Sequence, residues 1–317
     1  MKQFLKHLIP DQTLRRWRIH RLRAQYILRY GLSYLWPRLV TARIILRYPP
    51  IVTPAEGPVE LHLLTCKRDL LPACWSLYSW FHFAGRRDPL CIHDDGSLDE
   101  TCIRQLGTLF SGARIITRAE SDRDLGHYLK NHPHCWRYRQ GSKLSLKVFD
   151  FCYYARAPRI AIMDSDQAFF ARPDDYLRAF DPPVGQPERV VFTQDFQNAY
   201  AAPRWRVKAS TGLDLPDRLN SGLGLVYRDM MDLEFIERFV QLPEVWDKRM
   251  WAEQTLWALL AVRRGLDALG PAYHVALPEE RGIDQLVMKH YVGRSHRLFF
   301  VEAVPHLRKR LNMDAKR

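Results

Sequence analysis

The chain has 317 residues, of which 47% are apolar and 26% are charged. This composition is that of a folded globular protein, and it excludes a mainly disordered chain, a collagen-like repeat and a small disulfide-stapled fold. The six cysteines show no CxxC pair and no Cys/His zinc spacing. We therefore expect reduced thiols in a cytoplasmic protein, most of them packed as small buried hydrophobes.

The formal net charge of +13 is concentrated at one end of the chain. Residues 1–50 hold eleven Lys and Arg against one acidic residue, and residues 51–317 hold 37 against 34. The sequence thus predicts a strongly basic N-terminal extension on a nearly neutral body. No long apolar stretch is free of charges, so no segment is expected to span a bilayer. The N-terminus also lacks the unbroken apolar centre of a signal peptide.

In residues 1–50 the bases alternate with large apolar side chains such as Trp17, Tyr26 and Trp36. Such a mixture suits an anionic membrane surface, where apolar side chains enter the interface and bases meet headgroups. The arginines of residues 14–30 do not keep to one helical face, so a helical extension that packs on the main domain is equally well supported. Nucleic acid is the least favoured partner.

In chain order, we expect a helix over 11–30 that ends near Gly31, and a second over 38–47. The segment 48–58 has four prolines and one glycine, which marks a linker. We therefore divide the chain into an extension at 1–50, a proline-rich linker at 51–58 and a main domain at 59–317 with a basic C-terminal tail.

Alternating strands and helices follow the linker. Strands are predicted at 59–65, 89–94, 113–117, 159–163, 190–193, 222–227 and 273–276. Helices are predicted at 70–83, 98–110 (with Ser97 as the N-cap), 142–155, 232–241 and 252–264. This alternation indicates an α/β fold with a mostly parallel, Rossmann-like sheet flanked by helices. In such a sheet the ligand site lies at the carboxyl ends of the strands.

The strongest signal is at the end of the predicted strand 159–163, where the sequence continues Asp164-Ser165-Asp166. Two carboxylates this close raise each other's pKa, and a divalent cation removes the conflict. Oxygen ligation selects Mg²⁺ or Mn²⁺, and such ions typically hold phosphates. The alternative is a pair of loop aspartates, one of which caps the next segment.

Two further groups of polar residues lie beside apolar elements. Asn220-Ser221-Gly222 directly precedes an apolar strand, where glycine allows close approach to a ligand and where a simple turn is the alternative. Glu253-Gln254 opens an apolar helix, and on its own this carboxylate is explained by the helix dipole.

A third group is His290 with Gly293, Arg294 and Arg297 near the C-terminus. The histidine can serve as a nitrogen ligand to Mn²⁺, and the arginines can hold a phosphate. The alternative is a surface histidine in a basic tail.

The order and spacing of these motifs over about residues 59–297 resemble the GT-A fold nucleotide-sugar glycosyltransferases. The resemblance is closest to the retaining family 8, which includes glycogenin and bacterial lipopolysaccharide galactosyl- and glucosyltransferases. It implies that Mn²⁺ or Mg²⁺ is held by Asp164, Asp166 and His290. It implies a catalytic group of Asn220 at the donor sugar, Gln254 near the sugar ring and Glu253 beside it. It implies donor-binding residues Thr65, Cys66, Asp94, Asp95, Lys147, Asp164, Ser165, Ser221, Gly222, Gly293, Arg294 and Arg297.

Two departures from the family pattern bear on the mechanism. The family often has a lysine on the diphosphate where this chain has His296, so Arg294 or Arg297 would have to substitute. The turn that begins at Asp94-Asp95 resembles the DDGSxD turn of family 2, whose members invert the anomeric centre. If this chain inverts, Glu253 and Asp195 are the candidate bases.

The sequence therefore predicts a metal-dependent glycosyltransferase that moves a sugar, with retention, from a UDP-sugar to a glycan or lipid-linked acceptor. The expected location is the cytoplasm, with peripheral attachment to the inner face of the membrane as a further expectation. The alternatives are an inverting family 2 type of transferase and a membrane-associated protein that kept the fold without activity. A dehalogenase-type phosphatase is disfavoured, because its Asp-x-Asp normally follows the first strand.

Overall fold

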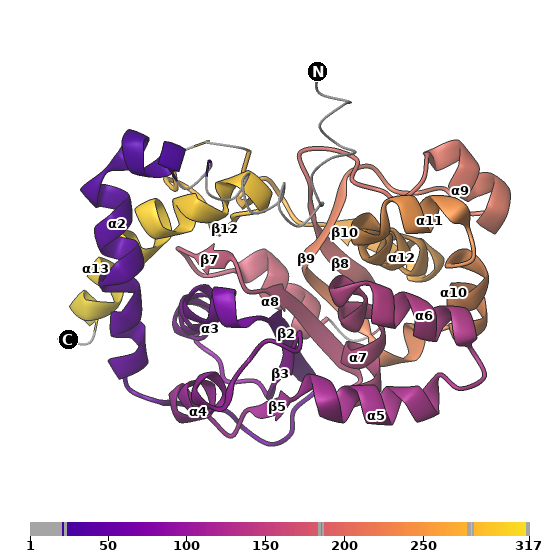
Figure 1. Cartoon of the computed structure of the whole chain (residues 1–317), viewed down its shortest axis with the longest axis horizontal. Coiled ribbons are helices and arrows are strands. Elements are labelled where there is room, and N and C mark those ends of the chain that lie inside the picture. The colour runs from indigo at the N-terminus through magenta and orange to yellow at the C-terminus, as the bar shows by residue number, and fades with distance from the viewer. Residues whose placement is uncertain are drawn as a thin grey trace, which may run out of the picture.

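The computed structural model describes residues 21, 24–182, 185, 187–277, 280 and 282–314. A seven-stranded sheet runs through the molecule with helices on both faces, and a three-stranded sheet lies beside it (Figure 1). This is the mixed α/β architecture with a mostly parallel central sheet that the sequence predicts.

The first half of the main sheet is parallel throughout. Its strands lie in the order β6-β2-β3-β5. They are β2 (Val59–Thr65), β3 (Leu90–Asp94), β5 (Arg114–Ile116) and β6 (Arg159–Asp164). The connecting helices are α3 (Leu70–Ala84), α4 (Glu100–Leu109), α5 (Arg118–Tyr128), α6 (Pro133–Gly141) and α7 (Leu146–Tyr154). The strand ends that carry the predicted site residues therefore meet at one edge.

The second half brings one long antiparallel strand into the sheet. This strand is β9 (Leu219–Tyr227), which runs antiparallel to β6 on one side and to β8 (Val190–Gln194) on the other, while β10 (Leu266–Ala268) closes the edge parallel to β8. The helices here are α8 (Asp174–Phe180), α9 (Arg204–Thr211), α10 (Leu233–Phe239), α11 (Pro243–Asp247) and α12 (Arg249–Arg264). Because β9 is antiparallel, its first residues lie at the same edge as the last residues of β6.

The smaller sheet delivers the C-terminal residues to that edge. It consists of β11 (Tyr273–Val275), β12 (Met288–His290) and β7 (Gln167–Phe169), in the order β11-β12-β7. His290 pairs with Gln167, directly after the Asp164–Asp166 turn. This pairing brings together residues that are more than a hundred positions apart in the chain.

The core has two halves, one on each face of the main sheet. Along β6, Ala161 and Met163 belong to one half, and Ile160 and Ile162 belong to the other. This alternation follows from the two-residue repeat of a strand. A strand buried on both faces is therefore apolar throughout, as the sequence RIAIM is.

The predicted strands and helices of the main domain are present, with shifted bounds. Helix α4 begins after Asp99, whose carboxylate accepts a hydrogen bond from the amide of Cys102, so Asp99 and not Ser97 is the N-cap. Helices α5 and α6 were not predicted. Their sequences are strongly polar, and in α5 only Ser121 and Leu125 are buried, so the apolar repeat that marks a helix is nearly absent.

The N-terminal segment also differs from the prediction. The chain stays helical beyond Gly31, in α2 (Leu32–Leu39), and Thr41–Arg47 is a 3-10 helix rather than an α-helix. The first half of the predicted helix 11–30 lies outside the described residues. In the part of the chain that the structure describes, no helix is long and apolar enough to cross a membrane.

The described part of the N-terminal segment packs on the main domain. Tyr26, Tyr34, Ala42 and Ile45 belong to the core, and the indole of Trp75 donates a 2.9 Å hydrogen bond to the carbonyl of Ala42. The predicted linker continues into a short strand, β1 (Ile51–Val52), that pairs with β4 (Phe110–Ser111). The last helix, α13 (Val304–Asp314), contacts the 3-10 helix of this segment.

Candidate active site

A cavity of about 610 Å³ opens at the carboxyl edge of β6, beside the start of β9 and the end of β12. The predicted site residues that line it are Lys147, Asp164, Asp166, Asn220, Ser221, Gly222, Glu253, Gln254, His290, Gly293 and Arg294. They come from five separate stretches of chain. The tertiary structure therefore gathers most of the residues selected from the sequence into one cavity.

Asp164, Asp166 and His290 form a cluster whose potential ligand atoms all lie within 4.8 Å of one another. Nε2 of His290 is 3.0 Å from Oδ1 of Asp166 and 3.5 Å from Oδ2 of Asp164. Burial opposes the charged form of His290, but the two carboxylates outweigh it and raise its pKa. Two carboxylates and one imidazole are a donor set that fits Mn²⁺ or Mg²⁺.

The ring of His290 is oriented by Asn220. The amide of Gly222 donates a 3.0 Å hydrogen bond to Oδ1 of Asn220, and Nδ2 of Asn220 donates one of 3.0 Å to Asp195. These two bonds identify which atom of the Asn220 side-chain amide is the oxygen and which is the nitrogen. Oδ1 must therefore accept the 3.1 Å bond from Nδ1–H of His290. Nε2 is then the nitrogen that faces the two carboxylates, which is the arrangement a metal ligand needs.

Gly222 is required for this arrangement. A Cβ at this position would lie 2.2 Å from Cε1 of the His290 ring and 2.9 Å from Oδ1 of Asn220. No side chain fits there without moving the histidine. The glycine predicted from the sequence to allow close approach does so, and the group that approaches is His290.

Lys147 is fully buried at the floor of the cavity. Its Nζ lies 2.9 Å from Oδ1 of Asp164, 3.3 Å from Glu253 and 3.0 Å from the carbonyl oxygen of Ser221. Burial alone would lower the pKa of Lys147, but Asp164 and Glu253 outweigh it and raise it. The lysine therefore stays charged and places its positive charge against the Asp164 carboxylate.

Helix α12 begins at Arg249, four residues before Glu253, so Glu253 and Gln254 do not open the helix as expected from the sequence but lie in its second turn, at the wall of the cavity. Burial raises the pKa of Glu253 to about 7, although Lys147 opposes the shift, and its Oε2 accepts a 2.9 Å bond from the hydroxyl of Ser221. Gln254 donates to the carbonyl of Ala199 at 3.0 Å and accepts from the amide of Ser221 at 3.3 Å. Both side chains are thus held by hydrogen bonds at the cavity wall.

The loop after β12 is a 3-10 helix, Gly293–Arg297, whose first residue has a φ of +54° that favours glycine. Gly293 and Arg294 line the cavity, whereas Arg297 lies over the ring of Tyr26. Nε2 of His296 lies 3.0 Å from Oδ1 of Asp69. Of the two arginines considered as substitutes for the lysine, only Arg294 thus faces the cavity.

The residues selected for nucleotide contacts lie at the same sheet edge but outside the cavity lining. Thr65 pairs with Asp94 across β2 and β3. Oδ1 of Asp94 accepts hydrogen bonds from the amides of Gly96, Ser97 and Leu98, so this carboxylate holds its own turn. The other members of this group are Cys66, which donates to Asp69; Asp95, which pairs with Lys143; and Ser165, in the turn after β6.

The cavity also has lining residues that sequence reasoning did not select. Phe196, Met250 and Trp251 form an apolar part of its wall. Asp69, beside the cavity, is buried and paired with His296. No sequence motif marks these residues, because each acquires its position through a loop or a helix start whose direction the sequence does not reveal.

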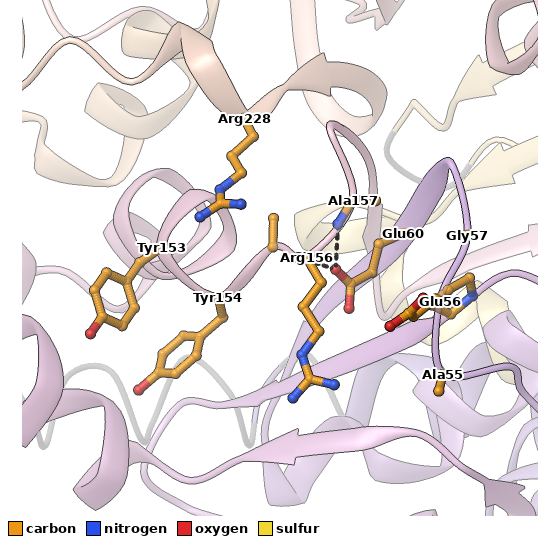
Figure 2. A pocket seen from close by; sticks show the side chains of 11 residues that line it. Ala55, Glu56, Gly57, Glu60, Tyr153, Tyr154, Arg156, Ala157 and Arg228 are labelled. Carbon is orange, nitrogen blue, oxygen red and sulfur yellow. Dashed lines mark hydrogen bonds between the residues drawn. The ribbon is translucent and has the colours of Figure 1, made fainter.

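A second cavity, of about 940 Å³, lies at the opposite, amino end of the strands (Figure 2). Arg156, Arg228 and two tyrosines surround it. Its buried carboxylate, Glu60, accepts a 2.7 Å bond from the amide of Arg156 and pairs with Arg114. The carboxylate of Glu60 is thus already paired with an arginine and hydrogen-bonded to the backbone of the protein itself.

A second cluster of potential metal ligands lies inside the sheet. His62, Cys91 and His93 also bring ligand atoms within 4.8 Å of one another, but all three are buried away from both cavities. Nδ1 of His62 is 3.0 Å from Nε2 of His93, and the ring of Phe151 packs against both. Burial lowers the pKa of both imidazoles and raises that of the Cys91 thiol, so all three groups are neutral.

Comparison with known proteins identifies the fold. No protein-family profile and no curated protein sequence matches the chain. Mouse xyloside xylosyltransferase 1 is similar with a TM-score of 0.50 and 13% identity, over 77% of this chain and 99% of that one. The galactosyltransferase LgtC, solved with donor and acceptor sugar analogues, is similar with a TM-score of 0.52 and 14% identity, over 79% and 95% of the two chains. The GT-A fold expected from the sequence is confirmed.

Proposed function

We propose that the protein is a metal-dependent glycosyltransferase that moves a sugar from a nucleotide-sugar donor, a UDP-sugar, to a glycan or lipid-linked acceptor. The observation that carries the proposal is the cluster of Asp164, Asp166 and His290 at the edge of a cavity in a GT-A fold. Beside this cluster the buried Lys147 lies 2.9 Å from Oδ1 of Asp164 and so places a fixed positive charge at the floor of the cavity.

Asp164, Asp166 and His290 would hold the Mn²⁺ or Mg²⁺ ion. When bound, such an ion supplies Lewis-acid stabilisation of the negative charge on the departing diphosphate. Around it, Lys147 pairs with Asp164, and Asn220 orients His290 so that Nε2 faces the two carboxylates. Arg294 adds a guanidinium at the cavity wall, where it can pair with a phosphate.

The reaction proposed here retains the anomeric configuration. Inversion requires a carboxylate base that reaches the acceptor hydroxyl. Glu253 is occupied by Lys147 and Ser221, and Asp195 accepts from Asn220. Gln254 is neutral, so it can orient the donor sugar but cannot remove a proton. The anomeric configuration of the product, read by proton NMR, tests this part of the proposal.

The decisive experiment is a thermal-shift screen of nucleotide sugars with and without Mn²⁺. A ligand that binds only the folded state raises the melting temperature. At a ligand concentration of 100 times its Kd, the free energy of unfolding increases by about 2.7 kcal/mol. We expect a UDP-sugar to stabilise the wild-type protein only when Mn²⁺ is present, and release of UDP to follow over time. Stabilisation by nucleotide sugars without any dependence on metal would contradict the proposal.

We further propose that the N-terminal segment docks on the cytoplasmic face of an anionic membrane, where a lipid-linked acceptor would be found. Leu28 precedes the turn at Gly31, Leu32 and Trp36 lie on α2 after it, and the three are 86%, 78% and 59% exposed. Arg43 and Arg47 are exposed just beyond them. Exposed apolar side chains beside arginines match the chemistry of an interface with anionic headgroups.

Vesicle sedimentation at low and high salt tests the docking, and the chain offers a matched pair of tryptophans. Trp36 lies on α2, whereas Trp205, 72% exposed, lies on α9 at the far side of the molecule (Figure 1). We expect Trp36→Ser to reduce binding to anionic vesicles and Trp205→Ser to leave it unchanged. Equal binding of both variants, or binding to neutral vesicles alone, would rule out this docking surface.

A further inference from the structure

The loop that carries Arg294 into the cavity is held at three points. The buried hydroxyl of Ser295 donates to the carbonyl of Ala276 at 3.3 Å, and His296 pairs with Asp69 at 3.0 Å. The third point is the hydroxyl of Tyr26, which donates a 3.0 Å hydrogen bond to the carbonyl of Arg294. Only this third contact comes from the N-terminal segment, 268 positions away.

Tyr26 also contacts the side chain of Arg297. The Arg297 guanidinium carbon is 5.7 Å from the centre of the Tyr26 ring, which places it within the range of a cation–π contact. The tyrosine therefore contacts the backbone of one arginine of the loop and the side chain of the other. It fixes the backbone of Arg294, whose side chain lines the cavity, and it attracts the side chain of Arg297 to its own ring.

Tyr26 is itself rigidly placed. It is only 5% exposed, belongs to the core and packs against the rings of Tyr30 and Tyr34. The same segment is bound to α3 through the hydrogen bond from Trp75 to Ala42. A hydrogen bond from a side chain that cannot move restricts its acceptor more than one from a flexible side chain does.

We infer that the N-terminal segment is part of the donor-binding site, with Tyr26 as a positioning residue that orders the Gly293–Arg297 loop for a diphosphate. This inference rests on the proposed function, since it assigns the loop to the donor. The peptide plane after Arg294 includes the carbonyl that Tyr26 binds, so this bond sets the direction in which the arginine leaves the backbone. An ordered loop lowers the entropy cost of binding the donor.

Tyr26→Phe is the informative variant, because it removes the hydroxyl and keeps the ring on which Arg297 lies. Tyr78→Phe is the matched control: its hydroxyl donates a 3.3 Å bond to the carbonyl of Pro49, which also ties the N-terminal region to the body but does not touch the loop. We expect Tyr26→Phe to raise the donor KM about fivefold, the worth of one ordinary hydrogen bond, with kcat unchanged. Tyr26→Ala, which also loses the ring, should raise it further.

Hydrogen exchange of the ligand-free protein provides a readout that does not depend on activity. We expect faster exchange of the amides of residues 293–297 in Tyr26→Phe than in the wild type, and no change there in Tyr78→Phe. If the wild type shows no metal-dependent nucleotide-sugar binding, the proposed function fails. If the wild type binds donor and the two variants match it in both KM and loop exchange, the role of Tyr26 is overturned and the proposed function stands.

Discussion

Two clusters in this molecule each bring three potential metal ligands within 4.8 Å, yet their surroundings are opposite. Asp164, Asp166 and His290 line a cavity and carry charges that Lys147 and Asn220 organise. His62, Cys91 and His93 are buried in the sheet and neutral, and one hydrogen bond of 3.0 Å joins the two imidazoles. Proximity of ligand atoms alone therefore does not make a metal site. The ion must also be able to reach the ligand atoms, and the set of ligands must carry negative charge.

The comparison is tested most strongly by Asp166→Ala. Removing this carboxylate should weaken Mn²⁺ binding more than about 100-fold, since even outer partners of metal ligands cost about 10–100-fold. Metal-dependent binding of the donor should be lost while the protein still folds. Isothermal titration with Mn²⁺ measures the effect, and Asp267→Ala, on the edge strand β10, is the control. Unchanged Mn²⁺ affinity would remove Asp166 from the site.

His93→Ala should affect stability and not metal binding. The variant leaves Nδ1 of His62 without its hydrogen-bond partner and opens a void beside Phe151. We expect a loss of about 2–4 kcal/mol in the free energy of unfolding. Urea denaturation measures the loss, and Mn²⁺ titration should give the wild-type affinity. A fall in metal content in His93→Ala, with wild-type stability, would show that the buried cluster holds a metal after all.

His290→Ala should weaken Mn²⁺ binding less than Asp166→Ala does. Two carboxylates remain in the variant, so we expect a loss of about 100-fold at most, the upper end of what the loss of an outer partner costs. The same titration gives the value. Equal affinity in the variant and the wild type would exclude His290 as a ligand.

The smallest expected effect is the pH dependence of stability in the metal-free protein. Burial lowers the pKa of His93 below its ordinary value of 6.5, so the unfolded chain binds more protons than the native one below that pH. The protein should lose stability as the pH falls through this range, by about 1.4 kcal/mol per pH unit for each such histidine. His93→Gln should show a shallower loss in acid denaturation curves.

His290 should show the opposite sign. Its pKa is raised in the folded protein, so its contribution to stability is present below pH 6.5 and is lost as the pH rises through the folded pKa. His290→Gln in the metal-free protein should therefore be closer to the wild type in stability at high pH than at low pH. Parallel curves for the His93 and His290 variants would contradict the contrast between the two clusters.

The sequence by itself determined the fold class and most of the cavity. Apolar runs such as RIAIM indicate strands buried on both faces, and their alternation with helices indicates a mostly parallel sheet. Because that sheet collects ligands at one edge, the strand-end residues Asp164 and Asp166 could be placed there from their positions in the chain alone. Asn220 comes at the start of its strand, and only the antiparallel direction of β9 brings it to the same edge. Helices α5 and α6 escaped prediction because their apolar repeat is too weak.

Only the tertiary structure decided which polar groups are available to a ligand. Asp94 and Arg297 have the side chains that a donor site needs. In the structure, however, the Asp94 carboxylate accepts hydrogen bonds from the backbone of its own turn, and the Arg297 guanidinium lies over the ring of Tyr26. The hydrogen bond between Tyr26 and Arg294 joins segments near the two ends of the chain. Neither segment contains a sequence motif that would predict this bond. Hydrogen bonds of this kind depend on the orientation of packed elements, which no short stretch of sequence encodes.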